Sequence, residues 1–178
     1  MNKLHFDSLL PYAIPGKQIV GIQNKNEYEK YISPEYLNLL MRFNGGIFFK
    51  NGIKMKLKNT IPFFSSGYLD FIFLYGHTKD TNGINYIINT QPTRMPITYI
   101  PIAECDGGNF LCLKKDSGEI FFWWHEAPYD SECFYKITDS IEDFINNLEP
   151  DEPEEHHTNK DIFDGTLTSF KERLSKLK

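Results

Sequence analysis

The stretch from Met95 to Glu126 restricts the fold of this chain more than any other part of the sequence. Within it lie three apolar runs: Tyr99–Ala103, Asn109–Leu113 and Glu119–Trp124. Two short polar segments, 106–108 and 115–118, separate these runs and contain glycine and aspartate. Short runs of β-branched and aromatic residues bounded by such segments are typical of strands joined by hairpins. The stretch therefore predicts a three-stranded antiparallel meander in the middle of the fold.

Two other segments have the pattern of an amphipathic helix. Ser33 suits the N-cap of the first helix and Pro34 its first helical position, and Asn44–Gly46 ends it. Asp139 or Ser140 suits the N-cap of the second. Apolar residues recur at i, i+3, i+4 and i+7 in both segments: Tyr36, Leu39, Leu40 and Phe43, then Ile141, Phe144, Ile145 and Leu148.

The remaining pattern adds strands around these elements. Asn-Gly is the preferred two-residue type I′ turn, so the segment 50–52 predicts a β-hairpin. Its two strands are expected at Gly46–Phe49 and Ile53–Leu57. Leu69–Tyr75 and Glu132–Ile137 are two more predicted strands, whereas residues 83–92 fit either a strand or one face of a helix. The whole pattern predicts an α+β domain.

Length and composition place limits on the class of protein. A chain of 178 residues is most simply built around one domain, and none of its apolar runs approaches the ~20 residues that span a bilayer. The N-terminus makes a poor signal peptide. The three cysteines, Cys105, Cys112 and Cys133, are odd in number and lie among apolar neighbours, so we expect core residues and no disulfide framework. These features favour a cytoplasmic protein.

Charge is distributed unevenly along the chain. The formal net charge is −5, but residues 1–125 balance to +3, residues 126–164 to −11 and residues 165–178 to +3. Such an acidic block repels nucleic acid and attracts basic partners. Two interpretations stay open: a solvated face and linker kept soluble by charge, or a surface that binds a basic protein. Contact with nucleic acid or a membrane is not expected.

The C-terminal part of the chain differs from the preceding domain in amino-acid composition. We expect a domain over residues 1–149, an acidic proline- and glutamate-rich linker over 150–160, and an amphipathic helix over 161–178. The apolar stripe of that helix is Leu167, Phe170, Leu174 and Leu177. Folding back onto the domain and dimerisation are both compatible with this stripe.

No residue cluster has the spacing of an active site. His125 and Glu126 follow two tryptophans, but a zinc site needs three or four convergent ligands, and the sequence has no CxxC or HxxxH pair. Cys133 and His125 lack any sign of an oxyanion loop. The segment 106–109 has no following helix or basic residue, so it predicts a hairpin turn and not a phosphate loop. We expect neither an enzyme nor a cofactor.

The aromatic run that ends the meander has two apolar faces. Ile120, Phe122 and Trp124 lie on one face of the predicted strand, and Phe121, Trp123 and His125 lie on the other. Either both faces are covered by the rest of the protein, or one presents aromatic anchors to a partner.

Three segments, in this order, carry a resemblance to a known family. The first is Ser33–Gly46, in which Pro-Glu-Tyr follows the serine and Asn-Gly-Gly ends the segment. The second is Ile100–Glu126, which contains Ile-Pro-Ile-Ala, Gly-Asn and Trp-Trp-His. The third is Thr138–Leu148. Over residues 27–148 the chain resembles the SUKH superfamily, which includes bacterial immunity proteins and yeast cell-wall synthesis regulators. The first helix is shorter than usual, Ile141 stands where phenylalanine is common, and nothing after Leu148 belongs to the pattern.

The resemblance implies an antiparallel sheet with flanking helices, and it favours a helix over residues 83–92. It also implies a binding module that neutralises a cognate toxin domain, with a scaffold or regulatory module without a toxin as the alternative. We expect the toxin to have a basic surface. The candidate contacts are Glu126, Asp130 and Glu132 after the meander, Asp106 at its opposite turn, and Trp123 as an anchor.

Overall fold

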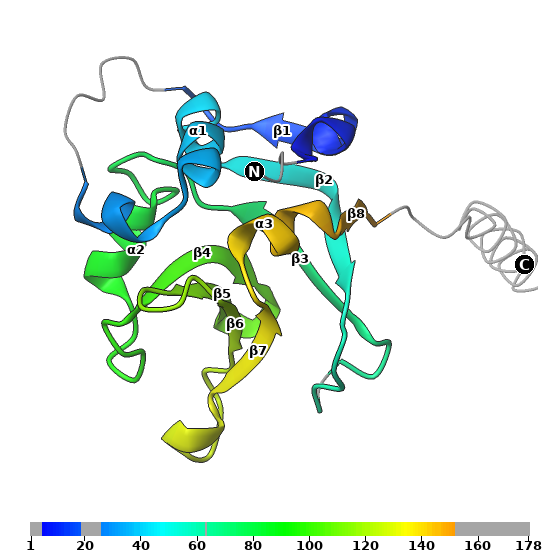
Figure 1. The fold of residues 1–178 in the computed structure, drawn as a ribbon, viewed down its shortest axis with the longest axis vertical. Coiled ribbons are helices and arrows are strands. Elements are labelled where there is room, and N and C mark those ends of the chain that lie inside the picture. The colour runs from blue at the N-terminus through cyan, green and yellow to red at the C-terminus, as the bar shows by residue number, and fades with distance from the viewer. Residues whose placement is uncertain (1–4, 19–25, 63, 152–178) are drawn as a thin grey trace, which may run out of the picture.

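An antiparallel sheet organises the part of the chain that the computed structural model describes, residues 5–18, 26–62 and 64–151 (Figure 1). Seven strands follow the order β1-β2-β3-β4-β5-β6-β7, and β8 pairs with β2. The strands are β1 (Ala13–Pro15), β2 (Ile47–Lys56), β3 (Tyr68–Leu74), β4 (Tyr99–Cys105), β5 (Asn109–Lys114), β6 (Ile120–Trp123), β7 (Phe134–Thr138) and β8 (Leu148–Pro150). The predicted α+β class and the meander, which is β4-β5-β6, are both confirmed.

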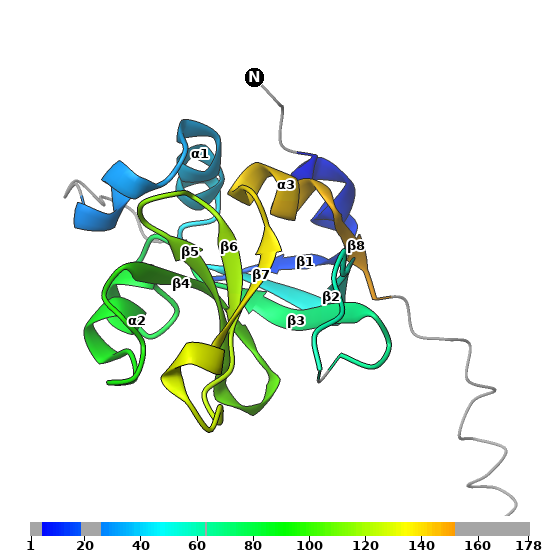
Figure 2. The ribbon, with the colours of Figure 1, turned by 60° about the horizontal axis from the view of Figure 1, so that its bottom comes forward.

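Short helices flank the sheet. They are α1 (Pro34–Arg42), α2 (Ile84–Thr90) and α3 (Ile141–Asn146), with 3₁₀ turns η1 (Phe6–Tyr12), η2 (Glu27–Tyr31), η3 (Asp106–Gly108) and η4 (Asp130–Glu132). Helices α1 and α3 lie beside each other against the sheet, and α2 packs on β4 (Figure 1, Figure 2). None of the helices in the described part is long and apolar enough to cross a membrane.

The predicted helix caps are confirmed, and one helix end is corrected. The Ser33 hydroxyl accepts a hydrogen bond from the backbone N–H of Tyr36 at 3.2 Å, and the Ser140 hydroxyl accepts one from Asp143 at 3.0 Å. Leu148, expected at the end of the second helix, instead begins β8. Helix α3 stops at Asn146, and the chain returns in extended form to pair with β2. The ambiguous segment 83–92 contains α2, as the resemblance implied.

The hairpin predicted at Asn51-Gly52 is wrong. Strand β2 continues through this dipeptide, and its register against β3 shifts between Phe48 and Ile53. Gly52 has a φ of +88°, so it supplies a left-handed residue to an irregularity inside one long strand. On its other edge, β2 pairs with β1 before the irregularity and with β8 after it. Two short edge strands therefore occupy one edge of a long, bent strand.

The Asn-Gly-Gly end of α1 lies where three backbone segments meet. The Gly16 N–H donates to the carbonyl oxygen of Gly46 at 2.9 Å. A Cβ on Gly45 would lie 2.3 Å from the carbonyl oxygen of Lys17, and one on Gly76 would lie 2.2 Å from the backbone nitrogen of Gly46. Side chains at these positions would hold the segments apart, because such distances are shorter than real Cβ contacts.

Two apolar clusters cover both faces of β6. Phe122 belongs to the main core, which also contains inward residues of α1 and α3. Trp123 belongs to a smaller second cluster, made of Met95, Cys112, Trp123, Ala127 and Cys133. The interpretation that both strand faces are covered is thereby confirmed. The three cysteines are buried and free, as expected of core residues.

A buried polar network joins η2 to the segment after β3. His77 is hydrogen-bonded at Nδ1 to the Tyr28 hydroxyl at 2.5 Å, and its Nε2 lies 3.0 Å from Nδ2 of Asn26. The same Nε2 lies 3.6 Å from Oε1 of Glu29. Burial lowers the pKa of His77, and the negative charge of Glu29 offsets this only in part. The folded protein therefore favours a neutral imidazole.

The free energy of unfolding is expected to fall as the pH drops from about 7 towards about 5, because the unfolded chain binds a proton at His77 near its ordinary pKa of about 6.5. The folded chain accepts that proton only at lower pH, so the loss continues down to the lowered pKa and then levels off. The substitution His77→Gln should flatten this part of the profile, measured by urea unfolding. His5→Gln, on an exposed residue, is the control and should keep the slope. Parallel profiles for His77→Gln and the wild type would contradict this account.

Candidate functional site

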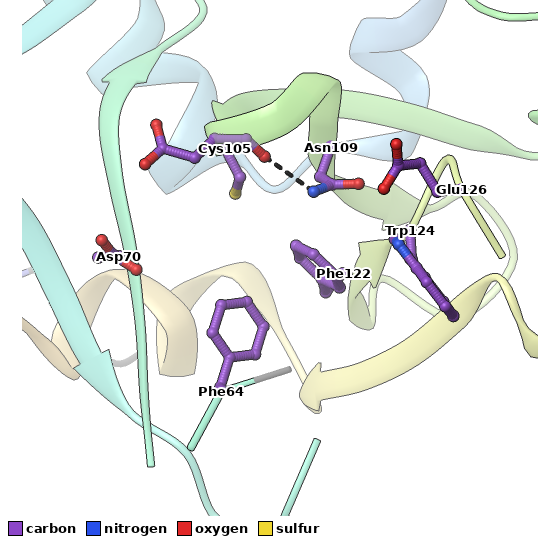
Figure 3. A pocket seen from close by; sticks show the side chains of 8 residues that line it. Phe64, Asp70, Cys105, Asn109, Phe122, Trp124 and Glu126 are labelled. Carbon is purple, nitrogen blue, oxygen red and sulfur yellow. Dashed lines mark hydrogen bonds between the residues drawn. The ribbon is translucent and has the colours of Figure 1, made fainter. Parts of the chain in front are cut away.

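A pocket of about 340 Å³ opens at one end of the meander (Figure 3). It is formed by the end of β4, the start of β5, the end of β6 and the loop after it, together with β3 and the segment before β3. The residues that line it are Phe64, Asp70, Cys105, Asp106, Asn109, Phe122, Trp124 and Glu126. The pocket joins residues that are up to 62 positions apart in the sequence.

Three carboxylates surround this pocket, and none of its described lining residues is basic. Asp70 and Glu126 lie on opposite sides in Figure 3, with Phe122 between them. Burial raises the pKa of Asp70, and the negative charges of Asp106 and Asp151 raise it further. Burial is the larger cause of the raised pKa, and the neighbouring carboxylates add to it. The pocket thus favours a cation.

Asn109 connects the two ends of the pocket. Its Nδ2 donates to the carbonyl oxygen of Asp106 at 2.8 Å, and its Oδ1 accepts from the backbone N–H of His125 at 3.1 Å. The imidazole Nδ1 of His125 lies 3.1 Å from the same Oδ1. One amide side chain therefore fixes the turn that carries Asp106 beside the loop that carries Glu126.

Aromatic rings form the rest of the wall. Phe64 and Phe122 lie with their centroids 5.0 Å apart in an edge-to-face arrangement. Trp124 is half-buried and also lines the pocket. Aromatic faces attract lysine and arginine side chains through the ring quadrupole, most strongly where water is partly excluded. Carboxylates and rings together suit a basic side chain of a partner.

The loop after β6 is held by Arg94, which lies between α2 and β4. Its guanidinium donates to the carbonyl oxygens of His125 at 3.2 Å and Ala127 at 2.9 Å. It also donates twice to Oδ1 of Asp130, at 3.0 and 2.8 Å. Asp130, a predicted contact, is therefore already paired within the protein. Glu132 is exposed two residues further along, in η4.

Replacing Arg94 by methionine should lower the free energy of unfolding by about 1–2 kcal/mol, because the carbonyl groups of His125 and Ala127 lose their donor. Amide hydrogen exchange should also accelerate in residues 125–133. Arg42→Met is the matched control: Arg42 forms an exposed pair with Asp7, which contributes little. Equal destabilisation by the two substitutions would contradict the role given to Arg94.

The described part of the chain has no group of three or more His, Cys, Asp or Glu side chains placed to hold a metal ion. His125 Nε2 lies 3.9 Å from Oε1 of Glu126. The imidazole is fixed by Asn109, and Gly108 lies directly beside it. His125 therefore has a structural role at the junction of the two loops.

A family model described as the SMI1/KNR4 family (SUKH-1) matches residues 22–147. The chain belongs to this family. It is also 40% identical over 79 residues to YokK, an SPbeta prophage-derived uncharacterized protein of Bacillus subtilis strain 168. The aligned part covers 44% of this chain and 41% of that protein, so less than half of the relative is matched. No solved structure matches the chain significantly.

Two SUKH motifs, Gly-Asn and Trp-x-His, lie at the pocket and are mainly structural in this chain. Asn109, of the Gly-Asn motif, joins two loops, and His125, of the Trp-x-His motif, is its partner. Trp123, of the same motif, is 1% exposed in the second cluster. It cannot present its ring to a partner from there, and Trp124 lies in the pocket wall instead.

The structure thus brings together two of the predicted contacts, Asp106 and Glu126, in one pocket. Asp130 and Glu132 lie on the adjoining loop. Sequence reasoning missed Asp70, because it is exposed at an outward position of β3, where strand alternation allows an ordinary solvated carboxylate. Phe64 carried no signal either, because its place beside Phe122 depends on the tertiary structure.

Proposed function

We propose that this chain is an immunity protein that acts in the cytoplasm and neutralises a cognate toxin domain by binding it, without chemistry of its own. The SUKH family includes bacterial immunity proteins, and the matched region spans nearly all of the described domain. The observation that carries the proposal is the pocket with Asp70, Asp106 and Glu126 and without a basic lining residue. It fits a partner that presents lysine or arginine.

The pocket would take a basic side chain from the toxin. A cation between Asp106 and Glu126 gains charge-assisted hydrogen bonds, and the ring of Trp124 adds a cation–π contribution. Many toxin domains that act on nucleic acid need a basic cleft for phosphate groups. Binding at such a cleft excludes the substrate by steric and electrostatic occlusion.

Charge outside the pocket supports fast association. The sequence from 126 to 164 has a balance of −11, and the exposed side chain of Glu132 lies within its described part. Complementary fields raise association rates by about 10- to 1,000-fold at low ionic strength. The association rate should therefore fall with added salt, while the dissociation rate changes less.

The deciding experiment is co-expression of the chain with the toxic domain of the protein encoded beside it. We expect restored growth and a stable complex in size-exclusion chromatography. If neither protection nor a complex is found, the immunity function is refuted. A complex with a non-toxic neighbouring protein would instead support the scaffold or regulatory function.

A further inference from the structure

An exposed apolar patch lies on the sheet beside the pocket described above. Its members are Ile14, Phe48 and Ile72, whose exposed fractions are 53%, 39% and 57%. Ile14 and Phe48 are cross-strand partners on β1 and β2. Phe48 and Ile72 line a second pocket of about 310 Å³, so the three side chains form one surface. An exposed apolar surface of this kind commonly marks an interaction site.

Negative charge borders the apolar patch. Glu104 and Asp106 line the same second pocket, and the Tyr75 hydroxyl donates to Oε2 of Glu104 at 3.0 Å. On β2, Lys54 is paired with Asp151 at 3.0 Å and Lys50 is exposed two residues from Phe48, but neither lysine lines the second pocket. An occupant of the patch therefore needs apolar side chains with basic residues beside them.

The described chain ends next to the patch. The Asp151 N–H donates to the carbonyl oxygen of Gly52 at 3.3 Å. A Cβ on Gly52 would lie 3.8 Å from Cβ of Asp151 and 3.9 Å from Cγ2 of Ile72. Asp151, the last described residue, therefore lies close to Ile72.

The C-terminal segment has the required chemistry. Residues 165–178 balance to +3. Their apolar positions recur at helical spacing: Leu167, Phe170, Leu174 and Leu177. The connecting residues 152–164 reach about 45 Å when fully extended, so length does not prevent docking. A tether of this size gives an effective concentration on the order of millimolar, which favours the chain's own segment over a second copy.

We propose that the segment 165–178 docks on the apolar patch of its own domain, with its apolar stripe against Phe48 and Ile72 and its basic residues towards Glu104. Docking removes the apolar patch on the face of the sheet from water. The inference rests on the patch and the chain end, and not on the proposed toxin binding.

Hydrogen–deuterium exchange of the full chain tests the docking. Amides in 165–178 should exchange at least about tenfold more slowly than in an unstructured chain. Ile72→Thr, which keeps a β-branched residue, and Phe170→Asp should each abolish this protection. The matched controls are Ile97→Thr, at a position 80% exposed outside the patch, and Ser169→Asp, at a position outside the apolar stripe.

Three results would overturn the proposal. Unprotected exchange of 165–178 in the wild type would show that the segment does not dock. Protection that survives Ile72→Thr would place the segment elsewhere. Protection that rises with protein concentration, together with a dimer in size-exclusion chromatography, would identify a second copy as the occupant. Circular dichroism of each variant distinguishes lost docking from a lost fold.

Discussion

Replacing both Asp106 and Glu126 by lysine is expected to weaken binding of the cognate toxin by at least about 100-fold, because like charges placed opposite each other cost several kcal/mol. Both residues line the acidic pocket and are exposed, so the core should tolerate the change. Isothermal titration calorimetry gives the affinity. Stopped-flow measurements at two salt concentrations show whether the salt-dependent part of the association rate is lost together with the affinity.

Asp116→Lys is the matched control for this charge reversal. Asp116 is an exposed carboxylate in the β5–β6 turn, at the end of β5 opposite to Asp106. The substitution Asp116→Lys should reduce the affinity for the toxin only slightly, through the change in net charge. If the control weakens binding as much as the double substitution, general charge and not the pocket determines recognition. Unchanged affinity of the double variant would place the interface elsewhere.

Gly45→Ala is expected to lower the free energy of unfolding by about 3 kcal/mol or more, which is at the upper end for overpacked sites. The added Cβ would lie 2.3 Å from the carbonyl oxygen of Lys17, a backbone atom that cannot rotate away. To relieve this clash, the segment that contains Lys17 must move away from the turn that follows α1. Urea denaturation monitored by tryptophan fluorescence measures the loss.

Comparison with Gly118→Ala separates the effect of crowding on stability from the effect of backbone conformation. Gly118 has a φ of +75° and has open space around its Cα, so alanine there incurs only the left-handed conformational cost of about 1–2 kcal/mol. Gly45 has no positive φ, so its expected loss is due to crowding alone. A smaller effect for Gly45→Ala than for Gly118→Ala would contradict the close packing at the end of α1.

Local signals predicted the elements whose structure is decided by neighbouring residues. The caps at Ser33 and Ser140 are hydrogen bonds from a backbone N–H to a side chain three residues earlier, so they depend on local sequence alone. The meander of β4, β5 and β6 was predictable for the same reason, since short turns join strands that are adjacent in sequence. The order of these motifs also identified the family, which the family model confirms.

Asn51-Gly52 shows why a correct local signal led to a wrong element. The dipeptide does supply a residue with positive φ, as a type I′ turn requires. Whether that residue makes a turn or an irregularity in a strand depends on the partners available. Here β3 pairs with both halves of β2, while β1 and β8 share its other edge. Those contacts come from distant parts of the chain.

The sequence by itself determined the two capped helices, the meander with its alternation, and the acidic residues Asp106 and Glu126 at its ends. Only the tertiary structure decided that these two carboxylates share a pocket with Asp70, and that Trp123 is buried while Trp124 lines the pocket wall. The physical reason is that Asn109 and Arg94 fix the loops that carry Asp106 and Glu126 by hydrogen bonds, and that the pairing of β3 with β4 brings Asp70 beside them. Periodicity records which face a residue occupies, whereas closure of such loops depends on packing across the whole sheet.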